Sequence, residues 1–524
     1  MNTLFSTIGR LFLLLVVLTY GIACTKNFED YNTDPNKVTE DQLKGDGQDV
    51  GSFFPNMQTS IMRVVDWEYQ TQQNLNADAY SGYMASRNPF IGGKNNLTYS
   101  MVPSWNTTAF DLGYSNVMSN WLVIKQRAET VKPDFYAVAT ILKVASIQRV
   151  TDLYGPLPYT RYGEGGFTAE YDAQDKIYAA FFEELTKAAA VLSAYVKEHP
   201  GAKPFQNFDL LFDGDYIKWV QFANTLKLRL AMRLTYVDAT TAKQKAEEAV
   251  AAENGLLAGE GVYVHQVNGT TYMNPLASIS NSWTDINMGA PMESYLVGYK
   301  DPRLGKYFTT SIESTNGYKG IRNGINIVAT DDYKSFSYLN IKNEDLMRLM
   351  SGAESYFLRA EGALRGWNMG GTPQALYETG IKASFAEAGA GASETYVQDN
   401  TSKPAAYIDP KNNANNANAP TTITIKWEET AAFEQKLERI ITQKWIALYP
   451  DGQEAWSEFR RTGYPKLFPV IVNFSGGTIP AGTYVKRLPF PQSELSNNTA
   501  AVAKAVQLLG GADNGGTRLW WDKK

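Results

Sequence analysis

Apolar residues recur at the spacing of an α-helix along a first long stretch of the chain, about residues 114–254. Residues 134–150 show the pattern clearly, because Phe135, Val138 and Ile141 fall on one face of a helix. The same spacing predicts further helices at residues 53–83, 114–131, 175–198, 216–236 and 240–254. Consecutive amphipathic helices with short connections predict helix pairs that pack against each other.

A second stretch, about residues 344–467, shows the helical spacing again. It predicts helices at residues 346–367 and 372–388, and Thr372 followed by Pro373 is a typical helix start. Residues 440–467 contain another pair, in which Pro450 ends the first helix and Asp451-x-x-Glu454 forms a capping box for the next. These pairs resemble tetratricopeptide repeats, with small and aromatic residues at the packing positions.

The two helical stretches are separated and followed by segments without a helical period. Residues 256–343 are rich in Gly, Asn, Ser, Thr and Tyr, and predict an irregular insertion with short strands such as Val262–Val264 and 325–329. Residues 394–422 predict a long loop with no core-forming content. Residues 50–524 are therefore expected to be mainly α, and their length alone would suggest two or three domains.

The N-terminus has the pattern of an export signal. Arg10 precedes an apolar run at residues 11–18 that is too short to span a bilayer, and small residues lead to Cys24, the only cysteine. This resembles a bacterial lipobox, in which the cysteine is lipidated, and it predicts a signal peptide at residues 1–23. Acyl chains on Cys24 would anchor the protein, because each buried CH₂ contributes about 0.8 kcal/mol. The polar residues 24–49 are then a lipid-anchored tether; the alternative is an ordinary secretory signal with an incidental cysteine.

Charge and composition limit the kinds of partner that the protein is expected to have. The formal net charge is −5 and the chain has no basic block, which argues against nucleic acid as a ligand. No second apolar stretch reaches the roughly 20 residues of a membrane-spanning helix. With one cysteine there is no internal disulfide, so stability must come from burial.

Aromatic residues mark the candidate ligand surface. Residues 67–105 are dense in Trp, Tyr, Asn and Gln and are broken by Pro89 and Gly92-Gly93, while Trp283 lies among hydrogen-bonding residues in a second loop. Rings of this kind stack on flat ligand faces, and the polar groups bind hydroxyls or amides. The candidate ligand residues are Trp67, Tyr80, Tyr83, Arg87, Trp105, Asn106, Trp283 and Asp285. The alternative is that these rings pack in the core and that Trp283 anchors its own loop.

Motifs for catalysis are missing from the sequence. The chain has two histidines, His199 and His265, and neither H-E-x-x-H nor G-x-S-x-G occurs. The GEGG run at residues 163–166 lacks the Lys-Ser/Thr of a phosphate-binding loop. We therefore expect no catalytic residues, no cofactor and no metal ligand set, although a bound calcium stays open. A glycosidase needs only two carboxylates, so a surface glycoside hydrolase remains an alternative.

Several longer motifs resemble one known family. They are YNTDPNK at 31–37, QRVTDLYGPLPYT at 148–160, SYFLRAEGALRGW at 355–367, QKWIALYPDGQEAWSEFRRTGYPKL at 443–467, RLPFPQSE at 487–494 and WWD at 520–522. With them the chain resembles SusD/RagB-type nutrient-binding outer-membrane lipoproteins of Bacteroidetes over nearly its whole length.

The resemblance implies a fold and a function. The fold would be a single, mainly α domain over residues 50–524, with tetratricopeptide-like helix pairs forming a right-handed superhelical scaffold, an irregular loop-rich ligand-bearing portion and a few short strands. The protein would be anchored in the outer membrane through Cys24, exposed at the cell surface. It would capture an oligosaccharide, or a peptide, and deliver it to a SusC-like TonB-dependent transporter. A structural adhesin without a transport role is a further alternative.

Overall fold

The computed structural model describes residues 47–165, 169–266 and 271–524. The predicted signal peptide, Cys24 and nearly all of the tether lie outside these residues. After the short helix α4 (Gln48–Gly51), the chain from Phe53 onward forms one unit, and the following description refers to that unit. None of its described helices is both long and apolar enough to cross a membrane.

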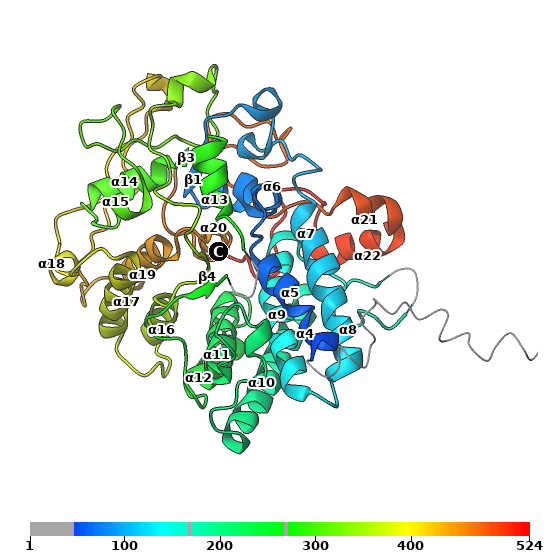
Figure 1. The fold of residues 1–524 in the computed structure, drawn as a ribbon. Coiled ribbons are helices and arrows are strands. Elements are labelled where there is room, and N and C mark those ends of the chain that lie inside the picture. The colour runs from blue at the N-terminus through cyan, green and yellow to red at the C-terminus, as the bar shows by residue number, and fades with distance from the viewer. Residues whose placement is uncertain (1–46, 166–168, 267–270) are drawn as a thin grey trace, which may run out of the picture. The chain divides into compact units, whose positions relative to one another are not determined.

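Five helices of the first helical stretch pack in sequence order (Figure 1). They are α8 (Ser119–Ala128), α9 (Pro133–Tyr154), α10 (Gln174–Glu198), α11 (Tyr216–Arg233) and α12 (Ala239–Val250). Each packs against the next, as predicted for helix pairs. The central helix α9 runs four residues beyond its predicted end and stops at Gly155, whose φ of +90° suits glycine. A Cβ at Gly155 would also press on Leu509 and Leu519, at 3.1 and 3.2 Å.

The second helical stretch contains α16 (Glu354–Leu364), α17 (Pro373–Ala388), α19 (Phe433–Leu448) and α20 (Gly452–Thr462). Helix α16 packs against α11, α17 and α19, and so joins the two stretches. The predicted cap at Thr372 is present, because its Oγ1 accepts from the Ala375 amide at 3.2 Å. Of the predicted capping box, Asp451 Oδ1 accepts from the Glu454 amide at 3.3 Å, while the Glu454 carboxylate pairs with Arg233 at 2.6 Å.

The helix predicted from residue 346 begins eight residues later than expected. Residues Met347–Met350 instead form strand β4, which pairs antiparallel with β2 (Val262–Val264). The two segments come within reach because Gly352 lies against the backbone of Glu260, where a Cβ would meet the Glu260 carbonyl carbon at 2.5 Å. Strand pairing between distant segments thus overrides the local helical pattern.

Only one of the two short strands predicted in the irregular insertion is present. Strand β3 (Ile286–Met288) pairs antiparallel with β1 (Met84–Ser86), and β2 forms at the predicted position. Residues 325–329 form no strand and continue as an extended loop into a 3₁₀ turn at Thr330–Tyr333. The remaining helices are α5 (Phe54–Ile61), α6 (Asp66–Tyr69), α7 (Thr108–Leu112), α13 (Pro275–Ala277), α14 (Ala290–Gly298), α15 (Leu304–Tyr307), α18 (Glu394–Val397), α21 (Gln492–Asn497) and α22 (Thr499–Leu509).

Residues 394–422 contribute to the core, against expectation. Tyr396 and Tyr407 are buried, and the Tyr396 hydroxyl donates to Asp301 Oδ2 at 2.7 Å while the Tyr407 hydroxyl donates to the Gly320 carbonyl at 3.0 Å. Single tyrosines in a polar segment give no periodic signal, so their burial depends on where the chain folds back.

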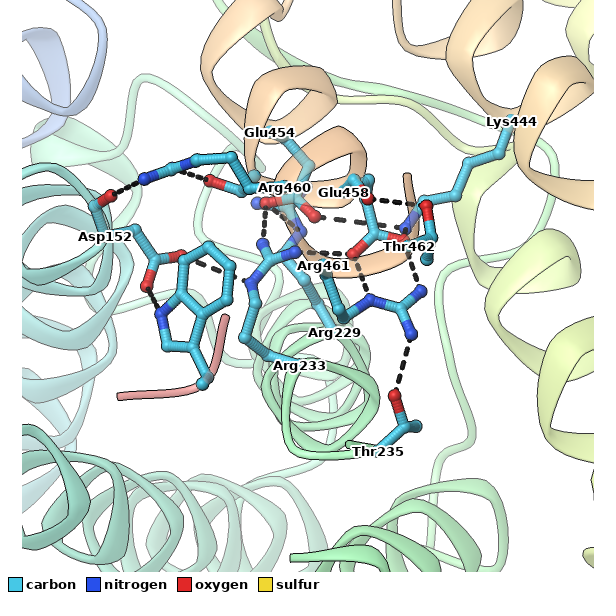
Figure 2. A network of polar contacts seen from close by, with 12 residues as sticks. Asp152, Arg229, Arg233, Thr235, Lys444, Glu454, Glu458, Arg460, Arg461 and Thr462 are labelled. Atoms are coloured by element: carbon cyan, nitrogen blue, oxygen red, sulfur yellow. Dashed lines mark hydrogen bonds and ion pairs between the residues drawn. The ribbon is translucent and has the colours of Figure 1, made fainter. Parts of the chain in front are cut away.

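A network of buried charges connects the helices of both stretches (Figure 2). Arg233 of α11 pairs with Glu454 at 2.6 Å and Glu458 at 2.5 Å, both on α20, and with Asp152 of α9 at 3.3 Å. Lys444 of α19 reaches Glu458 at 3.0 Å. Burial by itself would raise the pKa of Glu458, but the positive charges of Arg461, Lys444 and Arg233 hold it well below its ordinary value.

The network uses many of the charged residues in the longest motifs. Its buried, ion-paired members are the cations Arg229, Arg233, Lys444 and Arg461 and the carboxylates Asp152, Glu354, Glu361, Glu454 and Glu458. Arg460 joins it through hydrogen bonds to the Asp152 and Lys486 carbonyls and to Ser457 Oγ. Buried charges of this kind are compatible with a stable fold only when each keeps its partner. The motif charges therefore belong to the scaffold, as the sequence predicted for Asp451 and Glu454.

Candidate functional site

The segment predicted as one helix over residues 53–83 is divided into three parts. Helix α5 ends at Ile61, and α6 leads directly into a π-helix over Gln70–Asp78. Gln72 stabilises the break, because its Oε1 accepts from the Arg63 amide at 2.8 Å and its Nε2 donates to the Ser60 carbonyl at 3.1 Å. The wider π-helical turn changes the direction of the side chains that follow Trp67, and such turns are frequent at functional sites.

Asp285 joins this π-helix to two other segments. Its Oδ2 accepts from Gln70 Nε2 at 2.8 Å, and its Oδ1 accepts from Asn88 Nδ2 at 3.2 Å. The Asp285 carbonyl accepts from Ser86 Oγ at 2.7 Å, beside the β1–β3 pairing. Residues far apart in the sequence are thereby fixed at one place.

Two tryptophans at this place are exposed. Of the 11 tryptophans in the chain, all within the described residues, only Trp67 and Trp283 are exposed rather than buried or half-buried, at 61% and 39%. Trp67 lies one turn before Gln70, and Trp283 lies two residues before Asp285, so the Gln70–Asp285 bond connects their segments. Two exposed indoles beside fixed amide and carboxylate groups form a surface for stacking and hydrogen bonding. We call Trp67, Gln70, Asn88, Trp283 and Asp285 the aromatic face.

Arg87 has a role that differs from its prediction. Its side chain is buried and donates from Nε to the Thr284 carbonyl at 2.8 Å, from Nη2 to Thr284 Oγ1 at 2.5 Å, and from Nη1 to the Thr330 carbonyl at 3.2 Å. Thr284 has φ of +58°, which is unfavourable for a β-branched residue. Arg87 therefore holds the turn between Trp283 and Asp285, and its donors are used within the protein rather than for a ligand.

Tyr83 and Asn106 are also structural. Tyr83 has no exposed surface; its ring packs against Trp445 and Tyr449, and its hydroxyl donates to the Trp445 carbonyl. Asn106 is buried, with its Oδ1 accepting from Asn96 Nδ2 at 2.8 Å. These two predictions are corrected because an enclosed side chain with satisfied hydrogen bonds presents no surface to a ligand.

Tyr80 and Trp105 are half-buried and do not join the aromatic face. The Tyr80 hydroxyl donates to the Asn96 carbonyl at 3.1 Å, and its ring centroid lies 5.0 Å from that of Trp456. Trp105 packs edge to face with Phe90 at 5.5 Å. The Gln70–Asp285 bond thus joins the segments that carry Trp67 and Trp283, whereas Tyr80 and Trp105 pack against Trp456 and Phe90.

Gln70 and Asn88 are members of the site that the sequence analysis missed. Gln70 lies in a run of glutamines directly after Trp67, and Asn88 follows Arg87, so both were within the segment singled out. Nothing local distinguishes them from neighbouring amides. Only the position of Asp285, about 200 residues away, identifies them.

The aromatic face offers indole rings for stacking and amide and carboxylate groups for hydrogen bonds. His199 and His265 are both exposed and lie outside it. Among the residues that the structure describes, no group of three or more His, Cys, Asp or Glu side chains is placed to hold a metal ion. Beneath the face, at the end of the π-helix, burial raises the pKa of Asp78 to about 7; this carboxyl accepts from Gln73 at 2.7 Å and Asn74 at 3.2 Å.

A helical scaffold that presents two exposed indoles beside oriented polar groups defines a class of binding proteins. The chain belongs to the SusD-like family, described as Susd and RagB outer membrane lipoprotein, whose model matches residues 30–522. The mainly α, tetratricopeptide-like fold expected from the sequence is confirmed by this match and by the solved structures that share it. No curated protein matches the chain.

Solved structures of SusD homologues align over most of the chain. A chitin-binding homologue from Flavobacterium johnsoniae is 46% identical, with a TM-score of 0.88, covering 91% of this chain and 99% of that one. A homologue from Bacteroides vulgatus is 35% identical, with a TM-score of 0.87 and coverage of 92% and 99%. One from Bacteroides uniformis is 37% identical, with a TM-score of 0.85 and coverage of 91% and 99%.

Proposed function

We propose that this protein captures an oligosaccharide at the cell surface and delivers it to a SusC-like TonB-dependent transporter. Lipidation of Cys24 anchors it in the outer membrane, with the aromatic face turned to the medium. The observation that carries the proposal is that Trp67 and Trp283, the two tryptophans that are exposed in the described residues, lie on segments joined by the Gln70–Asp285 hydrogen bond. Indole faces stack on pyranose rings, and the adjoining amide and carboxylate bind hydroxyl groups.

The proposed ligand is an oligomer of N-acetylglucosamine, the repeating unit of chitin. The similarity to a chitin-binding homologue at 46% identity supports this choice over other glycans and over peptides. Binding of tetra-N-acetylchitotetraose to the full-length protein in mild detergent is expected, measured by isothermal titration calorimetry. The double variant W67A/W283A is expected to abolish the heat signal while it keeps the thermal unfolding profile of the wild type.

Delivery is tested separately from binding. A mild-detergent pull-down of the tagged lipoprotein from its own outer membrane is expected to bring down a TonB-dependent barrel in stoichiometric amount. Recovery of the protein alone from intact membranes would favour the adhesin alternative. Release of reducing ends from the same oligosaccharide by the purified protein would instead support the hydrolase alternative; we expect none.

A further inference from the structure

A buried carboxyl group is connected to the aromatic face by hydrogen bonds. Tyr69 directly precedes Gln70 and lies two residues after Trp67, in the single turn of α6. Its side chain is fully buried, and its hydroxyl donates to Oδ2 of Asp78 at 3.2 Å. Asp78 is fully buried as well. It is therefore tied to the segment that carries one exposed indole and the Gln70–Asp285 bond.

Gln73 connects the same carboxyl group to the scaffold. Its Nε2 donates both to Asp78 Oδ1 at 2.7 Å and to the Tyr69 hydroxyl at 3.1 Å. Its Oε1 accepts from Arg149 of α9, and Arg149 Nη1 donates to Asp451 Oδ1 at 3.1 Å. Arg149 thus fixes which way the Gln73 amide points. Asp78 Oδ1 consequently faces an N–H donor, and a proton on this carboxyl group is best placed on Oδ2.

Asn74 can accommodate such a proton. Its Nδ2 donates to Asp78 Oδ2 at 3.2 Å and to Met84 Sδ at 3.3 Å, while its buried Oδ1 has no hydrogen-bond partner in the described part of the chain. Rotation of the amide by half a turn exchanges the two atoms, so that the oxygen accepts where the nitrogen now donates. The exchange gives up only the weak contact with Met84. Both the ionised and the neutral carboxyl group therefore fit this place.

The two states of Asp78 hold Tyr69 with different strength. In the structure the carboxyl group accepts from Gln73, Asn74 and Tyr69, which is the arrangement of an ionised carboxylate. A hydrogen bond to a charged acceptor is about twice as strong as one to a neutral acceptor. Protonation of Oδ2 therefore weakens the bond from Tyr69. Because the Tyr69 ring stays enclosed in either state, we expect α6 to be held less firmly and not to be displaced.

Both states are populated near neutral pH. Burial raises the pKa of Asp78 to about 7, although the bonds from Gln73, Asn74 and Tyr69 act in the opposite direction. A change of pH around neutrality therefore changes the strength of the Tyr69–Asp78 bond.

The segments around the π-helix carry other ionisable groups. They are Tyr69 of α6, Asp111 of α7, Arg149 of α9, Tyr83 before β1, Tyr449 after α19 and Asp451 before α20. Burial raises the pKa of the three tyrosines well above the ordinary value, so they stay neutral between about pH 6 and 8.5. Arg149 and Asp451 are paired with each other.

We propose that ionisation of Asp78 regulates the aromatic face: the ligand binds more tightly to the ionised form, because Tyr69 then holds the turn that carries Trp67 more firmly. The inference rests on the proposed function and adds regulation of the same site by pH. Coupling is reciprocal, so a ligand that prefers the ionised form also releases the proton from Asp78. A preference of about threefold predicts that the affinity falls about 2.5-fold from pH 8.5 to pH 6.

The test measures affinity and proton release together. The full-length protein in mild detergent is titrated calorimetrically with tetra-N-acetylchitotetraose, which has no ionisable group, at about pH 6, 7 and 8.5. At pH 7 the titration is repeated in phosphate and in Tris, whose ionisation enthalpies differ. A proton released on binding is taken up by the buffer, so the heats differ between the two. The wild type is expected to release about a quarter of a proton at pH 7.

Two variants assign the effect to Asp78 and to its bond with Tyr69. D78N cannot ionise and is expected to show neither the pH dependence of affinity nor the buffer-dependent heat. Y69F removes the connecting hydroxyl but leaves Asp78 able to ionise. It is expected to keep the pH dependence of unfolding and to lose that of affinity. The matched control is Y171F, which removes a hydroxyl that donates to Glu494 at 2.7 Å outside the aromatic face and the π-helix, and which should behave as the wild type.

The outcomes separate the regulation from the proposed function. Equal affinity at all three pH values, or tighter binding at pH 6, overturns the regulation while the proposed function stands. A pH dependence of affinity that persists in folded D78N or in Y69F assigns it to another group and overturns the regulation as well. If the oligosaccharide binds at none of the three pH values, the proposed function fails and the regulation fails with it.

Discussion

The helical stretches and the aromatic face are held together by different kinds of polar contact. In the helices, Arg233, Glu454 and Glu458 are enclosed, and each charge is balanced by another within 2.6 Å. At the aromatic face, Asp285 is held by neutral amides, and the turn beside it depends on the positive φ of Thr284. Loss of one partner from the buried charges would destabilise the scaffold, whereas a surface held by loops and neutral hydrogen bonds can change at less cost to the scaffold.

The largest expected effect is a loss of stability in the helical scaffold. R233M removes a cation from among three buried carboxylates and is expected to lower the free energy of unfolding by about 3–5 kcal/mol. Urea denaturation followed by circular dichroism measures it. The matched control is R161M, an exposed arginine whose partners Glu164 and Glu170 are also exposed, and it is expected to leave the unfolding midpoint unchanged. A small loss in R233M would show that the network does not stabilise the helices.

The next effect removes binding while leaving the scaffold intact. W283A is expected to weaken oligosaccharide binding about tenfold, since an exposed stacking contact is lost and no core packing changes. Calorimetric titration gives the affinity and a thermal melt gives the stability. F433A, an exposed aromatic on α19, is the control and should leave the affinity unchanged. A fall in melting temperature with unchanged affinity would assign Trp283 to its own loop.

The dependence of stability on pH tests the contact between the π-helix at the aromatic face and helix α20 of the scaffold. Asp78 ends the π-helix and lies against Gly452 of α20, where a Cβ would fall 2.5 Å from the Asp78 Cα. Burial raises the pKa of Asp78 to about 7, so the stability that its protonated form contributes is present below about pH 4 and is lost as pH rises through 7. Between pH 6 and 8.5 the unfolding free energy is expected to fall by about 1–2 kcal/mol.

The variant D78N is the control for this titration. It cannot ionise, so its unfolding free energy is expected to change less between pH 6 and 8.5 than that of the wild type. Equal slopes in the two proteins would show that other groups titrate in this range.

The smallest expected effect concerns the turn beside Trp283. R87M removes the donors that hold Thr284 and is expected to weaken binding about threefold through misplacement of Trp283 and Asp285. T284G removes the strain of the positive φ, and the double variant R87M/T284G is expected to recover part of the affinity. The readout is the affinity for the oligosaccharide, together with its recovery in the double variant. No recovery would indicate that Arg87 acts on packing rather than on the turn.

Much of the scaffold could be predicted because its signals are local. The periodic apolar residues of α9, the cap at Thr372 and the Asp451-x-x-Glu454 start of α20 each depend on neighbours a few residues away. Strand β4 was mistaken for helix because its pairing with β2 joins residues more than 80 positions apart. The buried tyrosines of residues 394–422 were missed for the same reason.

The candidate site was predicted in part. The residue types that favour stacking and hydrogen bonding selected Trp67 and Trp283, which the fold leaves exposed, and also Tyr83 and Asn106, which the fold encloses. The sequence does not distinguish a buried tryptophan or tyrosine from an exposed one, because a large flat ring is favourable both for core packing and for stacking on a ligand.

The sequence by itself determined the helical scaffold, most of its caps and the kind of side chains at the aromatic face, since these follow from spacing and residue chemistry. Only the tertiary structure decided which rings are exposed, that Arg87 holds a turn, and that Gln70, Asn88 and Asp285 meet. The physical reason is that exposure and hydrogen-bond partners at a given residue depend on segments hundreds of positions away, brought there by the burial of the whole core.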